Sequence, residues 1–167
     1  RAGRWNGSAA TWVELHPTGA TSSEAHDTSG NHQVGTVYGG GSTRATRWSG
    51  TAASVIYLHP AAAGPGNSYA YGVFGAWQVG VAETPTSQAA RWSGTAASWV
   101  SLNPPGATGS YARACDSDHA VGLAVIAGAT HASLWSGTPA AWVDLHPAGA
   151  SGSEAHDVSD GQQAGYA

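Results

Sequence analysis

Two histidine–aspartate pairs, His26–Asp27 and His156–Asp157, occur in the same short context, S-E-A-H-D. Carboxylates suit hard divalent cations and imidazoles suit zinc or copper. If the chain folds as a ring, two such pairs around its central channel could hold a divalent cation. The same groups could instead hydrogen-bond a small ligand, or they could simply line a solvated channel. Tyr71 and Arg113 stand at the matching positions elsewhere in the chain. These six residues form the first candidate ligand-binding set.

Trp77 is the best single aromatic candidate for ligand contact. It follows the residues 74–76 in a predicted turn, where corresponding segments carry His32, His119 and Gln162. The remaining strand tryptophans alternate with valine and leucine, a pattern typical of packing between sheets. A tryptophan in a turn is instead expected to be exposed, and we add Trp77 to the candidate set.

Other residues that could bind a metal or react occur in patterns that indicate structural roles. His16, His59 and His146 stand in the motif L-H-P, but Asn103 replaces histidine in a fourth copy. Imidazole is a common metal ligand, but four copies around a ring would lie far apart, and histidine and asparagine can both cap a turn by hydrogen bonding. Cys115 is the only cysteine and is expected to be a buried, inert thiol. Because G-x-S-x-G, H-E-x-x-H and phosphate-loop motifs are absent, we predict no catalysis and no obligatory cofactor.

The candidate residues lie within a repeated unit. The stretch 90–104, ARWSGTAASWVSLNP, has four related copies, whose leading tryptophans are Trp5, Trp48, Trp92 and Trp135. These tryptophans are spaced by 43, 44 and 43 residues, a period typical of arrays of one supersecondary unit. The sequence therefore predicts a single repeat domain over 1–167, with repeats at about 1–43, 44–87, 88–130 and 131–167.

Each repeat contains four predicted strands. Alternating segments such as 99–102 have the period of a half-buried strand, and a proline such as Pro104 ends that strand. Turn residues such as those at 29–32 separate the two strands of a hairpin. Four strands in a little over 40 residues predict an all-β fold, a β-propeller of four four-stranded blades. A β-solenoid and a two-sheet sandwich are the alternatives.

The order of strands within a blade predicts how the ring closes. We expect the order from the channel outward to be the A-to-turn strand, the Q-V-G strand, the R-A-x-R-W strand and the W-V-x-L strand. Residues 1–18 would then supply two outer strands and residues 151–167 two inner strands, which together complete a blade. The alternatives are a monomeric ring and a homodimer in which two chains exchange their ends.

The composition excludes several classes of partner. Only 10% of the residues are charged, the net charge is -4 and lysine is absent. No basic stripe predicts nucleic-acid binding, and no apolar run is long enough to insert into a membrane. The absence of an initiator methionine and of a signal peptide suggests a processed form or an excised piece.

The repeat resembles the HAF family of bacterial extracellular repeats. That family's pattern runs HAF-x-W, a short turn, a d-L segment, S-x-A and a Q-V-V-G segment. Matching stretches of the fourth copy are H131-A-S-L-W135, V143-D-L145, S153-E-A155 and Q163-A-G165. The phenylalanine of HAF is absent from every copy, and Ala120 replaces the glutamine in the third. The resemblance implies a repeat fold and a secreted or cell-surface location, and it implies no catalytic residues.

These observations favour a non-catalytic, secreted binding module, with carbohydrate as the expected ligand class. Several similar shallow sites on one face would raise avidity for a glycan or surface polymer. A structural or protein-interaction segment of a larger surface protein is the second hypothesis. The third is an enzyme with its site at the channel mouth.

Overall fold

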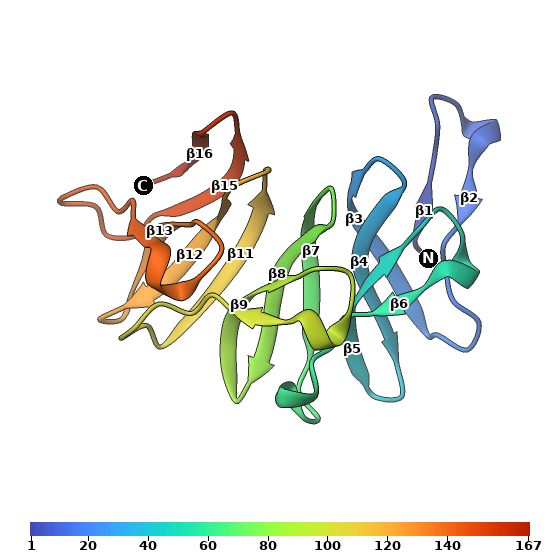
Figure 1. The fold of residues 1–167 in the computed structure, drawn as a ribbon, viewed down its shortest axis with the longest axis horizontal. Coiled ribbons are helices and arrows are strands. Elements are labelled where there is room, and N and C mark those ends of the chain that lie inside the picture. The colour runs from blue at the N-terminus through green and yellow to red at the C-terminus, as the bar shows by residue number, and fades with distance from the viewer.

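The computed structural model describes residues 1–167, which form antiparallel sheets arranged side by side (Figure 1). Three of the sheets have four strands each. The first contains β3 (Ser22–Ser29), β4 (His32–Gly39), β5 (Ser42–Trp48) and β6 (Ile56–Tyr57). The second contains β7 (Ser68–Phe74), β8 (Trp77–Thr84), β9 (Thr86–Trp92) and β10 (Val100–Ser101). The third contains β11 (Gly109–Cys115), β12 (Ala120–Ile126), β13 (Ala129–Trp135) and β14 (Trp142–Asp144).

Two further sheets have only two strands each. One pairs β1 (Gly3–Arg4) with β2 (Val13–Glu14), and the other pairs β15 (Glu154–Ser159) with β16 (Gln162–Tyr166). Five single-turn 3-10 helices complete the secondary structure: η1 (Ala9–Thr11), η2 (Ala52–Ser54), η3 (Ala61–Ala63), η4 (Ala96–Ser98) and η5 (Pro139–Ala141). Four of these, η1, η2, η4 and η5, lie in the small-residue segments that the sequence predicted as turns.

The all-β prediction and the predicted order of strands are confirmed. In each four-stranded sheet consecutive strands are hydrogen-bonded neighbours, as in β3-β4-β5-β6. Each sheet begins in one repeat and ends in the next, so the first spans residues 22–57. We call β3, β7, β11 and β15 the inner strands, because each begins its sheet and lies next to the inner strand of the following sheet.

The two-stranded sheets do not pair with each other in this chain. The strands β1 and β2 lie at one end of the row of sheets, and β15 and β16 lie at the other (Figure 1). They correspond to the outer two and the inner two strands of a complete sheet, as the sequence predicted. The row is therefore an open array of three complete sheets flanked by two half-sheets.

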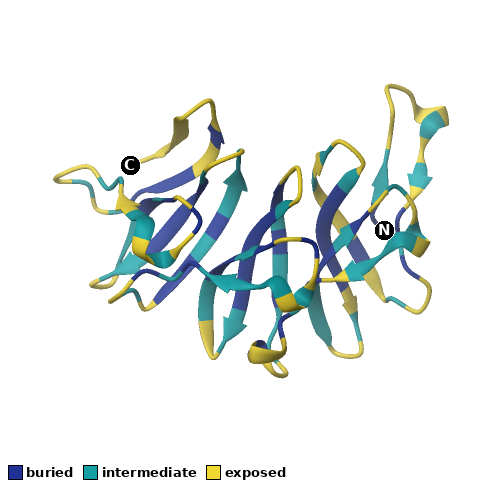
Figure 2. Ribbon diagram, viewed as in Figure 1, coloured by how far each residue is buried: buried dark blue, intermediate teal, exposed yellow.

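The core lies between neighbouring sheets (Figure 2). Trp48, Trp92 and Trp135 are fully buried there, which confirms their predicted packing role. Trp5 differs, since 62% of it is exposed and its ring stacks on Trp12 at a centroid distance of 5.4 Å. The cause is local: β1 has no strand of the β4 type beside it, so no neighbouring strand covers the Trp5 ring.

A repeated hydrogen-bonded junction joins each sheet to the next. In one copy the Ala45 amide donates to Ser68 Oγ at 3.0 Å, and Ser68 Oγ lies 2.9 Å from His59 Nδ1. The His59 Nε2 lies 3.1 Å from the Gly64 carbonyl oxygen, so the imidazole bridges the loop and the next inner strand. The equivalent side-chain pairs are His16–Ser23, Asn103–Ser110 and His146–Ser153. The histidine of L-H-P is thus part of the scaffold.

Candidate ligand-binding surface

The inner strands carry a β-bulge at one shared position, which a close backbone approach explains. The bulged residues are His26, Tyr71, Arg113 and His156. The glycine of the Q-V-G segment lies opposite, and a Cβ on Gly35 would overlap the carbonyl oxygen of the inner strand. A bulge leaves one residue outside the ladder and redirects its side chain. The repeat therefore presents one variable side chain per sheet at the same level.

Aromatic and cationic contacts connect these side chains across sheets. The rings of His26 and Tyr71 are 5.7 Å apart between centroids. The guanidinium of Arg113 lies over the Tyr71 ring at 5.4 Å and over the Tyr111 ring at 5.5 Å. Tyr69 stacks on Tyr71 at 6.2 Å with an interplanar angle of 9°. Three adjacent inner strands thus share one continuous surface.

The surface continues onto β15 through an ion pair. Arg113 Nε lies 2.6 Å from Glu154 Oε1, and Glu154 is only 7% exposed. Tyr166 of β16 continues the surface, because its hydroxyl lies 3.5 Å from Glu154 Oε2 and its ring lies 5.6 Å from the His156 ring. We define the inner-strand strip as the side chains that these contacts connect: His26, Tyr69, Tyr71, Tyr111, Arg113, Glu154, His156 and Tyr166. Its charged groups are paired, so the strip is polar without a strong net charge.

Burial raises the pKa of the Tyr71 hydroxyl, although the positive charge of Arg113 acts in the opposite direction. The hydroxyl therefore stays protonated at neutral pH and can both donate and accept a hydrogen bond. Beside it, between β3 and β7, lies a hollow of about 400 Å³. Its lining includes Ser22, Glu24, His26, Tyr38, Tyr69 and Tyr71. The hollow thus offers aromatic surface together with hydrogen-bond donors and acceptors.

The structure does not bring the two histidine–aspartate pairs together. His26–Asp27 lies on the first inner strand and His156–Asp157 on the last, with β7 and β11 between them. Asp27 also accepts two backbone hydrogen bonds, from Thr28 at 2.7 Å and from Val73 at 2.8 Å. The chain contains no group of three His, Cys, Asp or Glu side chains with the arrangement of a cation site. Asp27 thus acts here as a link between two sheets.

Trp77 stands apart from the strip. It is the first residue of β8 and is half-buried, so the expected exposure of a turn tryptophan is only partly observed. The Arg91 guanidinium covers its ring at 4.6 Å from the centroid. Such a cation–π contact occupies the ring face that a ligand would use.

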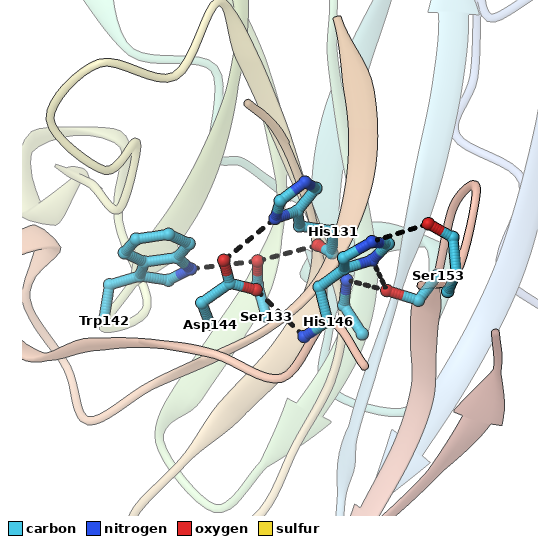
Figure 3. Close-up of polar contacts among 8 residues, drawn as sticks. His131, Ser133, Trp142, Asp144, His146 and Ser153 are labelled. Atoms are coloured by element: carbon cyan, nitrogen blue, oxygen red, sulfur yellow. Dashed lines mark hydrogen bonds and ion pairs between the residues drawn. The ribbon is translucent and has the colours of Figure 1, made fainter. Parts of the chain in front are cut away.

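A serine, two histidines and an aspartate lie close together near β13 and β14 (Figure 3). His131 Nδ1 lies 2.8 Å from Asp144 Oδ2, and the His131 ring stacks on His146 at 4.1 Å. His146 Nδ1 contacts Ser153 Oγ at 2.7 Å, but Ser153 is fully buried and already accepts the Ala132 amide. A nucleophile must be reachable, so this serine serves the junction between sheets.

Sequence reasoning missed several members of the strip. Tyr69, Tyr111 and Glu154 lie two positions before the bulged residues and so project on the same side of their strands. The signal was present, because Glu24 and these three residues occupy one position of the repeat and differ in chemistry. The side-chain period of two would have grouped them with Tyr71 and Arg113.

Comparison with protein-family models, with curated proteins and with solved structures gives no match to this chain. The structural class of this protein is therefore defined by its fold alone. It is an all-β array of four-stranded antiparallel sheets with a half-sheet at each end. None of its short helices has the length and hydropathy needed to cross a bilayer.

Proposed function

We propose that this chain is a non-catalytic binding module of the β-propeller type, and that its inner-strand strip binds carbohydrate. The observation that carries the proposal is the hollow of about 400 Å³ between β3 and β7. Ligand pockets for small molecules have volumes of about 300–1,000 Å³. A sugar offers hydroxyl groups to polar side chains and C–H faces to aromatic rings, and the hollow has both kinds of partner.

The distribution of polar groups supports a neutral, hydroxyl-rich ligand. Glu24 and His26 of β3 and Tyr71 of β7 all line the hollow. Arg113, the strip's only cation besides histidine, is already paired with Glu154. A strongly anionic ligand would have to compete with that carboxylate, whereas a neutral sugar would not.

In this proposal the scaffold is a closed ring, in which a half-sheet of the β15–β16 kind joins a half-sheet of the β1–β2 kind to complete a blade. Such a ring would place the inner strands around a channel, so that the strip faces its mouth. The resemblance to extracellular HAF repeats supports a secreted or cell-surface location, where glycans and surface polymers are available. Repeated inner strands would offer neighbouring contacts to one polymer and raise avidity.

The first test is a glycan array with the purified chain, followed by titration calorimetry with the strongest hit. Tyr71→Ala should weaken binding by at least about tenfold, because an aromatic face contributes on the order of 1–2 kcal/mol. Tyr57→Ala is the matched control, since Tyr57 is an exposed tyrosine on the outer strand β6. Tyr71→Phe separates the ring from its hydroxyl.

Two outcomes would contradict the proposal. One is an array without a hit, which favours the structural or protein-interaction hypothesis. The other is binding that Tyr71→Ala leaves unchanged while Tyr57→Ala abolishes it, because the site would then lie on the outer strands. A rate of glycan cleavage that falls with substitution in the strip would favour the enzyme hypothesis instead.

A further inference from the structure

The two half-sheets expose complementary strand edges. In all three complete sheets the second strand pairs with the third, as β4 does with β5. Strand β16 corresponds to β4, and its outer edge has no partner. Strand β1 corresponds to β5, and its inner edge has no partner either. Unpaired edges of this kind are templates for pairing with another strand.

Residues that are buried in the complete sheets are exposed in both half-sheets, because the neighbouring strands are missing. Trp5 is 62% exposed, whereas the equivalent Trp48 is fully buried. Ala164 on β16 is exposed, whereas the equivalent Val34 and Val79 are fully buried. The same repeat positions are therefore core in the complete sheets and surface in the half-sheets.

A groove lies where the missing strands would be. It has a volume of about 500 Å³ and is lined by Gly3, Arg4 and Trp5 of the half-sheet and by residues 25–28 of β3. At a complete boundary the corresponding space contains Val34, which packs with residues of β5 and of the next inner strand. Ala164 is the residue of β16 that would take the place of Val34.

The positions of the two half-sheets in the row favour one occupant for the groove. The half-sheets lie at opposite ends of the row of sheets, so β16 of the same chain does not reach the groove beside β1 (Figure 1). We propose that a second copy of this chain fills it, with β15–β16 of each copy completing the β1–β2 sheet of the other. Reciprocal exchange gives a two-fold symmetric dimer, and it leaves neither edge unpaired.

The register follows from the complete sheets. There Gln33 pairs with Trp48, Val34 with Arg47 and Gly35 with Thr46. We call the proposed pairing of β16 with β1 of the second copy the seam. At the seam Gln163 therefore pairs with Trp5, Ala164 with Arg4 and Gly165 with Gly3 of the second copy. These residues belong to the Q-A-G segment of β16 and to the R-W segment that begins the chain's first repeat.

One side-chain bond supports this register. Gln33 Oε1 accepts the Gly50 amide at 3.0 Å, and Gln78 Oε1 accepts the Gly94 amide at 2.7 Å. Both glycines follow the leading tryptophan by two residues, as Gly7 follows Trp5. At the seam Gln163 Oε1 would accept the Gly7 amide of the second copy. The two half-sheets therefore carry both residues of this recurring glutamine–glycine hydrogen bond.

Sedimentation equilibrium or native mass spectrometry of the chain 1–167 tests the proposal, which does not depend on any ligand. We expect a two-chain mass. Ala164→Arg should raise the dimer dissociation constant by at least about 100-fold, because it would bury a charge at the seam. Ala148→Arg is the matched control, as Ala148 is an exposed loop alanine of the same half of the chain. A single-chain mass for the parent, or an open series of masses, would overturn the exchange.

Disulfide trapping tests the register and the identity of the partner. We expect the double variant Arg4→Cys with Ala164→Cys to give a covalent two-chain species on mild oxidation. The predicted pair is a non-hydrogen-bonded one, in which side chains lie close. A disulfide formed within one chain would show that a chain closes its own ring, and no disulfide would contradict the seam. Each single variant controls for unrelated cross-linking, including any through Cys115.

Discussion

Ser110 contacts the side-chain amide of Asn103 in the same way as the equivalent serines contact a histidine in the other copies. Ser110 Oγ donates to Asn103 Oδ1 at 2.7 Å, and Asn103 Nδ2 donates to the Ala107 carbonyl at 3.2 Å. In the His59 copy, Nδ1 therefore takes the acceptor role and Nε2–H the donor role toward Gly64. The junction requires a neutral imidazole with the proton on Nε2.

His59→Asn should preserve this junction and remove part of its pH dependence. Burial lowers the pKa of His59 below 6.5, and the charge of Arg44 lowers it further, against the opposing hydrogen bond to Gly64. The unfolded chain therefore binds this proton at higher pH than the folded one. Stability from neutral His59 is present above about pH 6.5 and is lost as the pH falls through the folded pKa.

Urea unfolding at pH 8 and pH 5 measures this effect. The parent should lose more free energy of unfolding between the two pH values than His59→Asn does. His26→Asn removes one exposed imidazole that makes no junction, and it serves as the control. Equal losses in the parent and in His59→Asn would contradict the assigned role of Nδ1.

Arg113→Met should destabilise the chain by about 2 kcal/mol, because it leaves the nearly buried Glu154 carboxylate without its partner. Adding Glu154→Gln should recover at least half of that loss. Arg1→Met is the matched control, since the Arg1–Glu14 pair is well exposed and should contribute less than about 0.5 kcal/mol. Equal effects at the two sites in urea unfolding would contradict the burial argument.

Gly80→Ala should cost about 3 kcal/mol, because the new Cβ would overlap the Tyr69 carbonyl oxygen at the bulge. Gly39→Ala is the control, since a Cβ there meets only the Ala20 Cα at an ordinary 3.8 Å. We expect Gly39→Ala to change the free energy of unfolding by less than about 0.5 kcal/mol. Thermal unfolding of both variants measures the difference, and a tolerated Gly80→Ala would argue against the bulge.

Cys115 should resist alkylation in the folded chain. Burial, reinforced by the charges of Asp27 and Asp116, raises its pKa to about 12. At pH 8 only roughly one thiol in ten thousand would be ionised, and the thiolate is the reactive form. Mass spectrometry after iodoacetamide treatment should find native chain unlabelled and urea-unfolded chain fully labelled. Rapid labelling of the native chain would indicate an accessible thiol.

Much of the fold was predictable because the four copies of the repeat can be compared with one another. The spacing of Trp48, Trp92 and Trp135 set the period, and the alternation of apolar residues located the strands. The fate of Trp5 was not predictable from the same pattern. Its burial depends on a second strand that lies beyond its own half-sheet, and identical sequence signals therefore gave a core residue in three copies and a surface residue in the fourth.

The candidate site was predictable only in part. Comparing copies identified Tyr71 and Arg113 as variable positions, but the pairing of Arg113 with Glu154 spans 41 residues and leaves no local pattern. Asp27 was chosen for its carboxylate, whereas the structure uses that carboxylate to accept the Val73 amide of the next sheet. Whether a side chain is free for a ligand depends on partners that sequence spacing does not reveal.

The shared junction makes the repeat a unit of duplication. Every sheet meets its neighbour through the same alanine amide, serine hydroxyl and imidazole or amide side chain. Because a repeat contacts only its neighbours, excising residues 44–87 would place β4 beside the rest of β9, as β4 now lies beside β5, and would keep the junction between β9 and β11. Such arrays can lengthen or shorten by whole repeats during evolution without a new interface having to arise, while the bulged residue of each copy remains free to diverge.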